Sequence, residues 1–400
     1  MTLETRAVAG EQELREFARV HATAFGHRFE EERLTKLILP ALEQVSCVAA
    51  YDGGTMVGVS VDQRLEITLP GGRFAPARGI TWVGVLPTER RRGVLRALLD
   101  HQHAEFAEHG VPLSLLYASQ TTIYDRFGYG PATVRATEAE VDNRHGAFAT
   151  PLEDSGAVVM IDEESPVAVM REVLERSRPQ IPGEVDRSDH DLADLFADGD
   201  KKEFRIAHRD SGGGHDGFAV YRIDQDWQFG TIARSRLVVS TLLAATTEAY
   251  AGIWRYLLDL DLTRVVCVSN RPLDDPIRWL LAEWRHYLVK HVADGLWVKM
   301  VDPLAALEAR GYAADGRLVL DVAGERLLLE AAGGEARCTR SDLEPQIELD
   351  ASVLAATYLG GVRFTNLRDG RRLRERSDGA CRLADQMFAS ERDPWCSYEF

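Results

Sequence analysis

A cluster of arginines follows an apolar strand and precedes a helix, and this order of residue types favours a phosphate-bearing ligand. The apolar run Ile80–Leu86 leads through Pro87 into R-R-R-G, which ends at Gly93. The free N–H groups of a helix's first turn and the positive end of its dipole attract anions. Guanidinium groups add bidentate donors, and Gly93 lets the backbone approach closely because it has no Cβ. We therefore expect a phosphate cradle; the P-loop pattern is absent, so an NTPase has no support.

The turn from Arg90 to Gly93 spells R-x-x-G directly after a strand that ends with Val83 and Val85. In this context it resembles the acetyl-CoA pyrophosphate site of the GNAT N-acetyltransferases, which reads [Q/R]-x-x-G-x-[G/A]. Leu95 stands at the last position and departs from that pattern. The alternative is a solvated arginine cluster, but positive charge at a helix N-terminus is unfavourable unless an anion lies there. The motif favours coenzyme binding.

Acetyl transfer to an amine needs a held thioester, a deprotonated amine and a proton for the departing thiolate. The backbone of Val83–Val85 can extend toward the thioester arm. Tyr124 and Tyr129 both follow the next strand, and a phenol with a pKa of about 10 stays protonated at pH 7. Tyr129 lies between two glycines in F-G-Y-G-P, where a ring often packs in the core. The residues alone leave both open as the acid, and they single out no base: His101 and His103 are expected at the surface of the helix.

Three separated motifs carry a more specific resemblance. V-L-P-T-E-R-R-R-G-V-L-R-A-L-L, I-Y-D-R-F-G-Y-G-P-A-T and the ending W-C-S-Y-E-F are similar to those of the Eis (enhanced intracellular survival) family, actinobacterial aminoglycoside N-acetyltransferases. The resemblance covers the whole chain and implies an α/β and α+β fold with tandem GNAT-like domains. A coenzyme-binding GNAT domain is expected over residues 1–145 and a second GNAT-like domain without a coenzyme site over 146–295. A sterol-carrier-protein-like α+β domain is expected over 296–400.

The resemblance also implies the site residues, with acetyl-CoA as co-substrate and no metal. It makes Tyr124 the general acid and the terminal carboxylate of Phe400 the general base. An α-carboxyl has a pKa of about 3.3–3.7, so the alternative is that this carboxylate orients the ammonium while water carries the proton. Residues expected at the coenzyme are Val83, Gly84, Val85, Arg90, Arg91, Arg92, Gly93, Val94, Leu95, Arg96, Ser119 and Gln120. Residues expected at the acceptor are Glu399, Phe400, Phe25 and Trp82.

Composition limits the function classes. A chain of 400 residues is too long for one compact core. The net charge of −16 argues against nucleic acid and suits a polycationic partner, although an acidic surface also keeps a protein soluble. No apolar run approaches the roughly 18 residues of a membrane span, and the N-terminal segment is acidic where a signal peptide is apolar, so we expect a cytoplasmic protein. The five cysteines lack C-x-x-C spacing, which disfavours a disulfide framework or structural zinc.

Secondary-structure patterns place the motif in a larger frame. Helices are expected over Glu11–Phe25, about 29–42 and Arg92–His109, and strands over Ser46–Tyr51, Met56–Thr68 and Leu113–Ala118. From Leu237 a second strand–helix–strand pattern begins, and its expected turn, Ser240–Leu243, has neither arginine nor glycine. We interpret it as a duplicated unit that has lost its phosphate cradle; the alternative is an ordinary α/β segment. After the helix start at Asp302-Pro303, short alternating strands indicate an α+β domain.

These features predict an acetyl-CoA-dependent N-acetyltransferase that acts on amines of polycationic small molecules, aminoglycosides by resemblance, and that assembles as a homo-hexamer, again by resemblance. The same chemistry could serve protein lysines or polyamines. A non-catalytic ligand-binding protein with a disabled transferase domain is a further alternative, to which Leu95 points. The turn at Arg90–Gly93 and Tyr124 oppose it.

Overall fold

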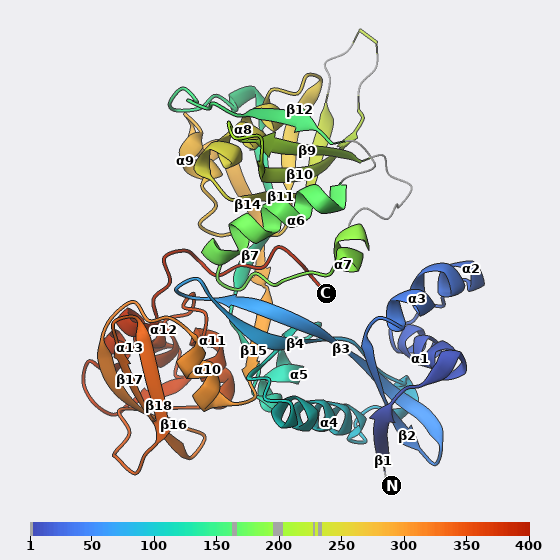
Figure 1. Ribbon diagram of the computed structural model, residues 1–400, viewed down its shortest axis with the longest axis vertical. Coiled ribbons are helices and arrows are strands. Elements are labelled where there is room, and N and C mark those ends of the chain that lie inside the picture. The colour runs from blue at the N-terminus through green and yellow to red at the C-terminus, as the bar shows by residue number, and fades with distance from the viewer. Residues whose placement is uncertain (1–2, 162–165, 195–202, 227–228, 231–233) are drawn as a thin grey trace.

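The computed structural model describes residues 3–161, 166–194, 203–226, 229–230 and 234–400. Within these residues the strands form three sheets. Figure 1 shows them as a blue-to-teal N-terminal domain, a green-to-yellow second domain and an orange-to-red C-terminal domain, with the C-terminal tail passing between the other two.

The first sheet has the strand order β1-β2-β3-β4-β5-β15-β6 and carries a helix on each face. Side chains alternate along β2: Ala49 and Tyr51 belong to the apolar cluster under α1, while Val48 and Ala50 pack with Val94 of α4. This alternation explains why one strand is buried on both sides. The elements are β1 (Leu3–Ala7), α1 (Gly10–Ala24), α2 (Glu31–Arg33), a π-turn (Leu34–Ile38), α3 (Leu39–Leu42), β2 (Ser46–Asp52), β3 (Thr55–Leu69), β4 (Arg73–Val85), α4 (Val94–Glu108), β5 (Leu113–Tyr117), α5 (Thr121–Tyr124) and β6 (Gly130–Pro131).

Strands β4 and β5 open a gap in the middle of this sheet. They pair in parallel only from Ala77↔Leu113 to Ile80↔Leu116, and β4 then continues to Val85 paired only with β3. A bulge in the β3–β4 pairing lies opposite Ser60 in this part, where Trp82 has a φ of +52°. Bulges re-aim side chains, and a non-glycine residue at positive φ is sparsely populated and is found mainly where the surroundings hold it. The backbone of β4 beyond Ile80 is thus free on its β5 side.

The second domain repeats this frame. Its order is β13-β7-β12-β11-β10-β9-β8, and β11 pairs in parallel with β12 only as far as Val239↔Val268 before it continues to Ala244 paired only with β10. The expected turn at Ser240–Leu243 is wrong: these residues lie inside β11, and the turn is at Ala245 and Thr246. The elements are β7 (Val134–Asp142), β8 (Ala157–Met160), α6 (Pro166–Ser177), α7 (Asp189–Asp194), β9 (Phe204–Arg209), β10 (His215–Asp224), β11 (Ser235–Ala244), α8 (Thr247–Leu258), β12 (Thr263–Val268), β13 (Arg271–Pro272), α9 (Ile277–Leu280) and β14 (Tyr287–Asp294).

Two strands cross the boundaries expected from the sequence. Strand β7, expected in the first domain, pairs with β12, β13 and β14 of the second sheet. Strand β15 (Leu296–Met300), expected in the third domain, pairs with β5 and β6 of the first. Breaks at 145/146 and 295/296 therefore do not follow the sheets. Each crossing strand pairs with partners far away in the chain, and local composition carries no signal of such pairing.

The C-terminal domain is a mixed sheet, β18-β17-β16-β19-β20, with helices packed on it. The side chain of Asp302 caps α10 by accepting from the N–H groups of Leu304 and Ala305. The domain shares one apolar core with the inner strands of the first sheet. The elements are α10 (Pro303–Ala309), β16 (Gly316–Val322), β17 (Glu325–Ala332), β18 (Glu335–Arg340), β19 (Ile347–Leu349), α11 (Ala351–Thr357), α12 (Phe364–Asp369), β20 (Leu373–Glu375) and α13 (Ala380–Phe388).

Two general expectations can be checked on the described residues. All five cysteines are buried free thiols, so none of them forms a disulfide. No helix in the described part of the chain combines the length and apolarity needed to cross a membrane.

Candidate active site

A cavity of about 1100 Å³ lies where β4, α4 and α5 meet, and we name it the β4–α4 cavity. It gathers most of the residues that the sequence predicts for the coenzyme, together with Tyr124 and with Phe25, which was expected at the acceptor. It is lined by Thr23, Ala24, Phe25, Gly26, Val83, Gly84, Val85, Pro87, Glu89, Arg90, Arg91, Gly93, Val94, Leu95, Arg96, Ser119, Gln120, Ile123, Tyr124, Arg126 and Phe127.

Helix α4 points its N-terminus at this cavity. Its N-cap is Gly93, which has a φ of +86° and no side chain to cap the first turn. The Cβ of any other residue would meet nothing within 4 Å there, so conformation rather than crowding calls for glycine. The first N–H groups of a helix have no partner within it, and the dipole adds positive potential. Val94, Leu95 and Arg96 therefore present an anion-binding turn to the cavity.

The three consecutive arginines of the motif behave differently. Arg90 lines the cavity and donates to the carbonyl of Ala24 at 2.9 Å, which ties the turn to the end of α1. Arg91 also lines the cavity and has a φ of +64°. Arg92 lies outside the lining and pairs with Glu89 and with Asp52. The structure thus brings two of the three to the cavity, and coenzyme contact by Arg92 has no support from this geometry.

The two candidate tyrosines have different surroundings: Tyr124 lines the cavity, and Tyr129 lies in the core. Tyr124, at the end of α5, lines the cavity, and burial raises its pKa to about 12, so the phenol is protonated at neutral pH. Tyr129 is fully buried, and its hydroxyl bonds to Ser114 Oγ at 2.7 Å and to His103 Nε2 at 2.8 Å. His103 therefore faces inward rather than lying at the surface. Of these two tyrosines, only Tyr124 lines the β4–α4 cavity.

A second cavity of about 540 Å³ lies on the other side of β4, and we name it the tail cavity. Trp82 lines it, whereas the next residue, Val83, lines the β4–α4 cavity. Its walls come from the α2–α3 segment, from β3 and β4, from α7 and from the chain's end. The lining is Arg33, Lys36, Leu37, Ile38, Pro40, Ala41, Leu42, Val45, Val61, Gln63, Thr81, Trp82, His190, Asp191, Tyr398, Glu399 and Phe400.

The C-terminus is packed rather than frayed. The Phe400 ring lies 5.5 Å from the Tyr117 ring, and a Cβ at Gly79 would meet Phe400 Cε2 at 2.7 Å. The Tyr117 hydroxyl donates to the carbonyl of Tyr398 at 2.6 Å, and Arg135 pairs with Glu399. The rings of Tyr117 and Phe400 thus pack the end of the chain against the first sheet, while Arg135 of β7 ties Glu399 to the second.

Two features of the site were not predicted. Arg126 lines the β4–α4 cavity and is a further cation there; it lies inside the quoted I-Y-D-R-F motif, which is the signal that could have found it. His21 stacks on Trp82 at 4.3 Å between ring centroids, and its buried Nδ1 has no hydrogen-bond partner. Burial and the nearby His27 lower the pKa of His21 to about 4, so the imidazole beside the bulge is neutral at pH 7. Its helical position alone gave no such signal.

Comparison with known proteins agrees with this architecture. The family model described as an acetyltransferase (GNAT) domain matches residues 5–132, a second GNAT model matches 183–300, and a sterol carrier protein domain matches 303–397. The fold and site thus define a tandem GNAT N-acetyltransferase with a sterol-carrier-like C-terminal domain.

More specific similarity comes from complete relatives. The N-acetyltransferase Eis of Mycobacterium tuberculosis is 35% identical over 365 residues, which cover 88% of this chain and 87% of the relative. An uncharacterized N-acetyltransferase of Streptomyces avermitilis is 32% identical over 392 residues, 94% of this chain and 95% of the relative. The crystal structure of Eis1 from Mycobacterium abscessus superposes with a TM-score of 0.89 at 29% identity, covering 99% of this chain and 100% of that one. The chain belongs to the Eis family of N-acetyltransferases.

Proposed function

We propose that the β4–α4 cavity binds acetyl-CoA and that the acetyl group passes across β4 to an amine in the tail cavity. The observation that carries this proposal is an uncapped helix N-terminus next to Arg90 and Arg91, beside a strand whose backbone is free along its β5 edge. The helix turn and guanidinium groups suit the pyrophosphate. The free backbone of Val83–Val85 suits the amide-bearing arm that carries the thioester.

The reaction then needs two proton transfers. The amine nitrogen attacks the thioester carbonyl carbon, a C–N bond forms, and the C–S bond breaks as the thiolate leaves. Tyr124 gives its phenolic proton to that thiolate, which its raised pKa permits because the phenol is protonated before the reaction. The carboxylate of Phe400 holds the acceptor ammonium and accepts the proton that it loses, directly or through water.

Aminoglycosides are the proposed acceptors, as the resemblance of the motifs implies. The net charge of −16 attracts polycations, and Asp191, Glu399 and the terminal carboxylate place anionic groups at the tail cavity. Several amines on one acceptor could then be held away from the reacting one.

A second acceptor class is favoured by the rest of that lining. Arg33 and Lys36 also line the tail cavity and repel a polycation, and the α2–α3 segment adds aliphatic side chains such as Leu37. These features suit a single amine on an apolar or acidic body, such as the lysine of a peptide. Polyamines fit this half of the lining poorly.

A homo-hexamer is the proposed assembly. Trp279 is 75% exposed and stacks with Trp284 at 6.3 Å between ring centroids, while Leu288 and Val292 are exposed on the neighbouring strand β14. Exposed apolar patches of this kind mark association surfaces. Light scattering should give six chain masses, and Trp279→Glu should lower that number; a monomer in the unaltered protein would refute the assembly.

Thiol release from acetyl-CoA tests the enzyme and its acceptor together. The panel contains aminoglycosides, lysine peptides with acidic or apolar flanks, and a linear polyamine. Release with aminoglycosides alone supports the first acceptor class, and release with the peptides alone supports the second. Release with none of these amines would refute the proposed function.

A further inference from the structure

The chain's own tail forms part of the wall of the second domain's counterpart of the coenzyme cavity. A cavity of about 230 Å³ there is lined by the end of β11, the turn at Ala245 and Thr246, and Asp274 beyond β12, which are the equivalents of the elements around the β4–α4 cavity. Trp395 forms part of its wall and belongs to the apolar cluster of α6 and Leu243. The tail therefore contributes a core residue to this domain.

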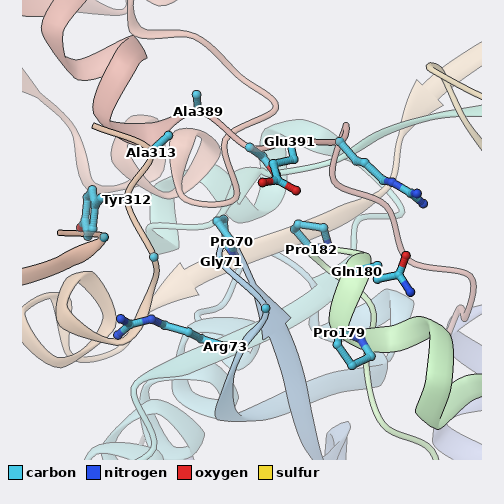
Figure 2. A pocket seen from close by; sticks show the side chains of 15 residues that line it. Pro70, Gly71, Arg73, Pro179, Gln180, Pro182, Tyr312, Ala313, Ala389 and Glu391 are labelled. Carbon is cyan, nitrogen blue, oxygen red and sulfur yellow. The ribbon is translucent and has the colours of Figure 1, made fainter. Parts of the chain in front are cut away.

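The tail enters this position through the junction of the three domains. Figure 2 shows Ala389 and Glu391, where the chain leaves the C-terminal domain, close to Pro70 and Gly71 of the first domain and Pro182 of the second. Further along, Asp393 N–H donates to Asp274 Oδ2 at 3.0 Å, and Trp395 N–H donates to the Pro182 carbonyl at 2.9 Å. Backbone bonds of this kind fix the path of the segment.

Side chains of the second domain then fix Trp395 itself. Its indole N–H donates to Asn270 Oδ1 at 3.1 Å, and the Asn270 amide donates to the Cys396 carbonyl at 3.2 Å. The guanidinium of Arg271 lies 5.0 Å from the indole ring. The indole thus has a polar partner at its edge and a cation over its face.

A buried ion pair holds the next residues. Glu184 and Arg187 are almost fully buried and pair at 3.2 Å. Glu184 accepts from Ser397 N–H at 3.1 Å, and Arg187 bonds to Ser397 Oγ and lies 4.8 Å from the Tyr398 ring. The thiol of Cys396 also donates to Glu184, and burial with that carboxylate raises the thiol's pKa to about 12, so it stays a donor.

The ion pair is itself fixed to the first sheet. Thr68 N–H donates to the Glu184 carbonyl at 2.8 Å, and Gly183 N–H donates to the Thr68 carbonyl at 2.8 Å, which extends the edge of β3. A charge pair in this position is costly to bury, and the hydrogen bonds to Glu184 and Arg187 offset that cost although Arg187 Nε has no partner. It links the second domain, the first sheet and the tail at one point, three residues before Phe400.

We propose that Glu184 and Arg187 are positioning residues, and that the second GNAT domain, with Trp395 in its former coenzyme cleft, serves as the anchor that holds Phe400 in the tail cavity. The proposal rests on the proposed function, because the anchored group is the carboxylate assigned to the acceptor amine. The carboxylate can act only if the last three residues keep one path, and the contacts from 393 to 398 fix that path.

Two independent variants of the intact protein test the anchor. Arg187→Met leaves Glu184 buried and unpaired, and Ser397→Pro removes the tail N–H that Glu184 accepts while leaving the pair intact. Ser397→Ala keeps that N–H, and Arg171→Met removes a neighbouring guanidinium whose partners are Asp186 and Asp189. If Arg187→Met fails to fold, Ser397→Pro decides the question.

The readouts are the rate at which carboxypeptidase A releases Phe400 from the native protein, and kcat and KM for acetyl transfer. Both primary variants should raise the release rate at least tenfold and lower kcat at least tenfold, with KM for acetyl-CoA within twofold of the unaltered protein. Arg187→Lys should restore most of kcat, while Ser397→Ala and Arg171→Met should stay within threefold. Unchanged release in both primary variants, or faster release with unchanged kcat, would overturn the proposal. An unaltered protein that acetylates no amine would refute the proposed function, whereas the release rates would still decide the anchor.

Discussion

The two GNAT domains share the same arrangement of strands and helices, and each has an opening, the gap between β4 and β5 in the first and between β11 and β12 in the second. They differ in what lies at that opening. In both, the central strand continues five residues beyond its last parallel partner, from Ile80 to Val85 and from Val239 to Ala244. The first then has a glycine N-cap with arginines beside it. In the second, Thr246 caps α8 with its own side chain by accepting from Ala249 N–H at 3.1 Å.

The difference shows how one fold can keep or lose a ligand site. The N–H groups of an uncapped helix require an external acceptor, which is the role proposed for the anionic coenzyme. A threonine cap satisfies one of these groups internally, and Trp395 of the tail lines the second cavity and packs with the α6 cluster. The four predictions below test this comparison, and the expected effects decrease from the first to the last.

The largest effect is expected for Tyr124→Phe, which removes the proposed acid from the first opening. Loss of general acid catalysis lowers kcat by about 100-fold or more. KM for acetyl-CoA should not change, because the ring remains. Since the pKa of Tyr124 is about 12, kcat of the unaltered protein should not fall from loss of this proton below about pH 11.

Tyr129→Phe is the matched control for the acid. It removes the hydroxyl that bonds to Ser114 and His103 without removing a group from the cavity. Steady-state kinetics should show kcat within a few-fold of the unaltered protein. Equal losses in the two variants would contradict the assignment of Tyr124.

Trp395→Ala tests whether the tail tryptophan at the second opening is a structural core residue. Truncation of a buried tryptophan costs about 3–5 kcal/mol of the free energy of unfolding. Urea unfolding should show this loss, while Leu343→Ala at an exposed position should change the value by less than about 0.5 kcal/mol. Acetyl-CoA affinity should be unchanged, and a large loss of affinity would contradict the separation of the two openings.

Arg91→Ala should weaken acetyl-CoA binding in the first opening by roughly tenfold or more. This loss in affinity corresponds to the free energy of about one charge-assisted hydrogen bond. Arg92→Ala should change affinity much less, since Arg92 pairs with Glu89 and Asp52 instead of lining the cavity. Calorimetry of the two variants measures the contrast. A larger loss for Arg92→Ala would reverse the assignment of the cradle.

The smallest effect concerns His103 beneath the first opening. Burial and the charge of Lys299 lower the pKa of His103 to about 3, against about 6.5 in the unfolded chain. The unfolded state therefore binds more protons, and stability falls by about 1 kcal/mol as the pH drops from 6.5 to 5.5. Urea unfolding of His103→Gln should show a flatter pH dependence; an unchanged slope would contradict this burial.

Local patterns predicted the cradle and the repeated frame, because strand, turn and helix signals lie within some 30 residues. Tyr124 and Tyr129 could not be separated from the residues alone, since a cavity wall and a core position differ only in what surrounds them. The exclusion of Arg92 depends on Asp52, and the path of the tail depends on Glu184 and Arg187. Contacts between residues that lie 40 to more than 200 positions apart in the chain leave no periodic pattern in the sequence.

The central claim is that only the first of the two openings accepts the coenzyme. Isothermal titration calorimetry of the intact protein with acetyl-CoA measures this directly as the number of sites per chain. One site per chain, weakened by Arg91→Ala and unaffected by Trp395→Ala, is the predicted result. Two sites per chain, or one site that survives Arg91→Ala and is lost with changes around Trp395, would contradict the account.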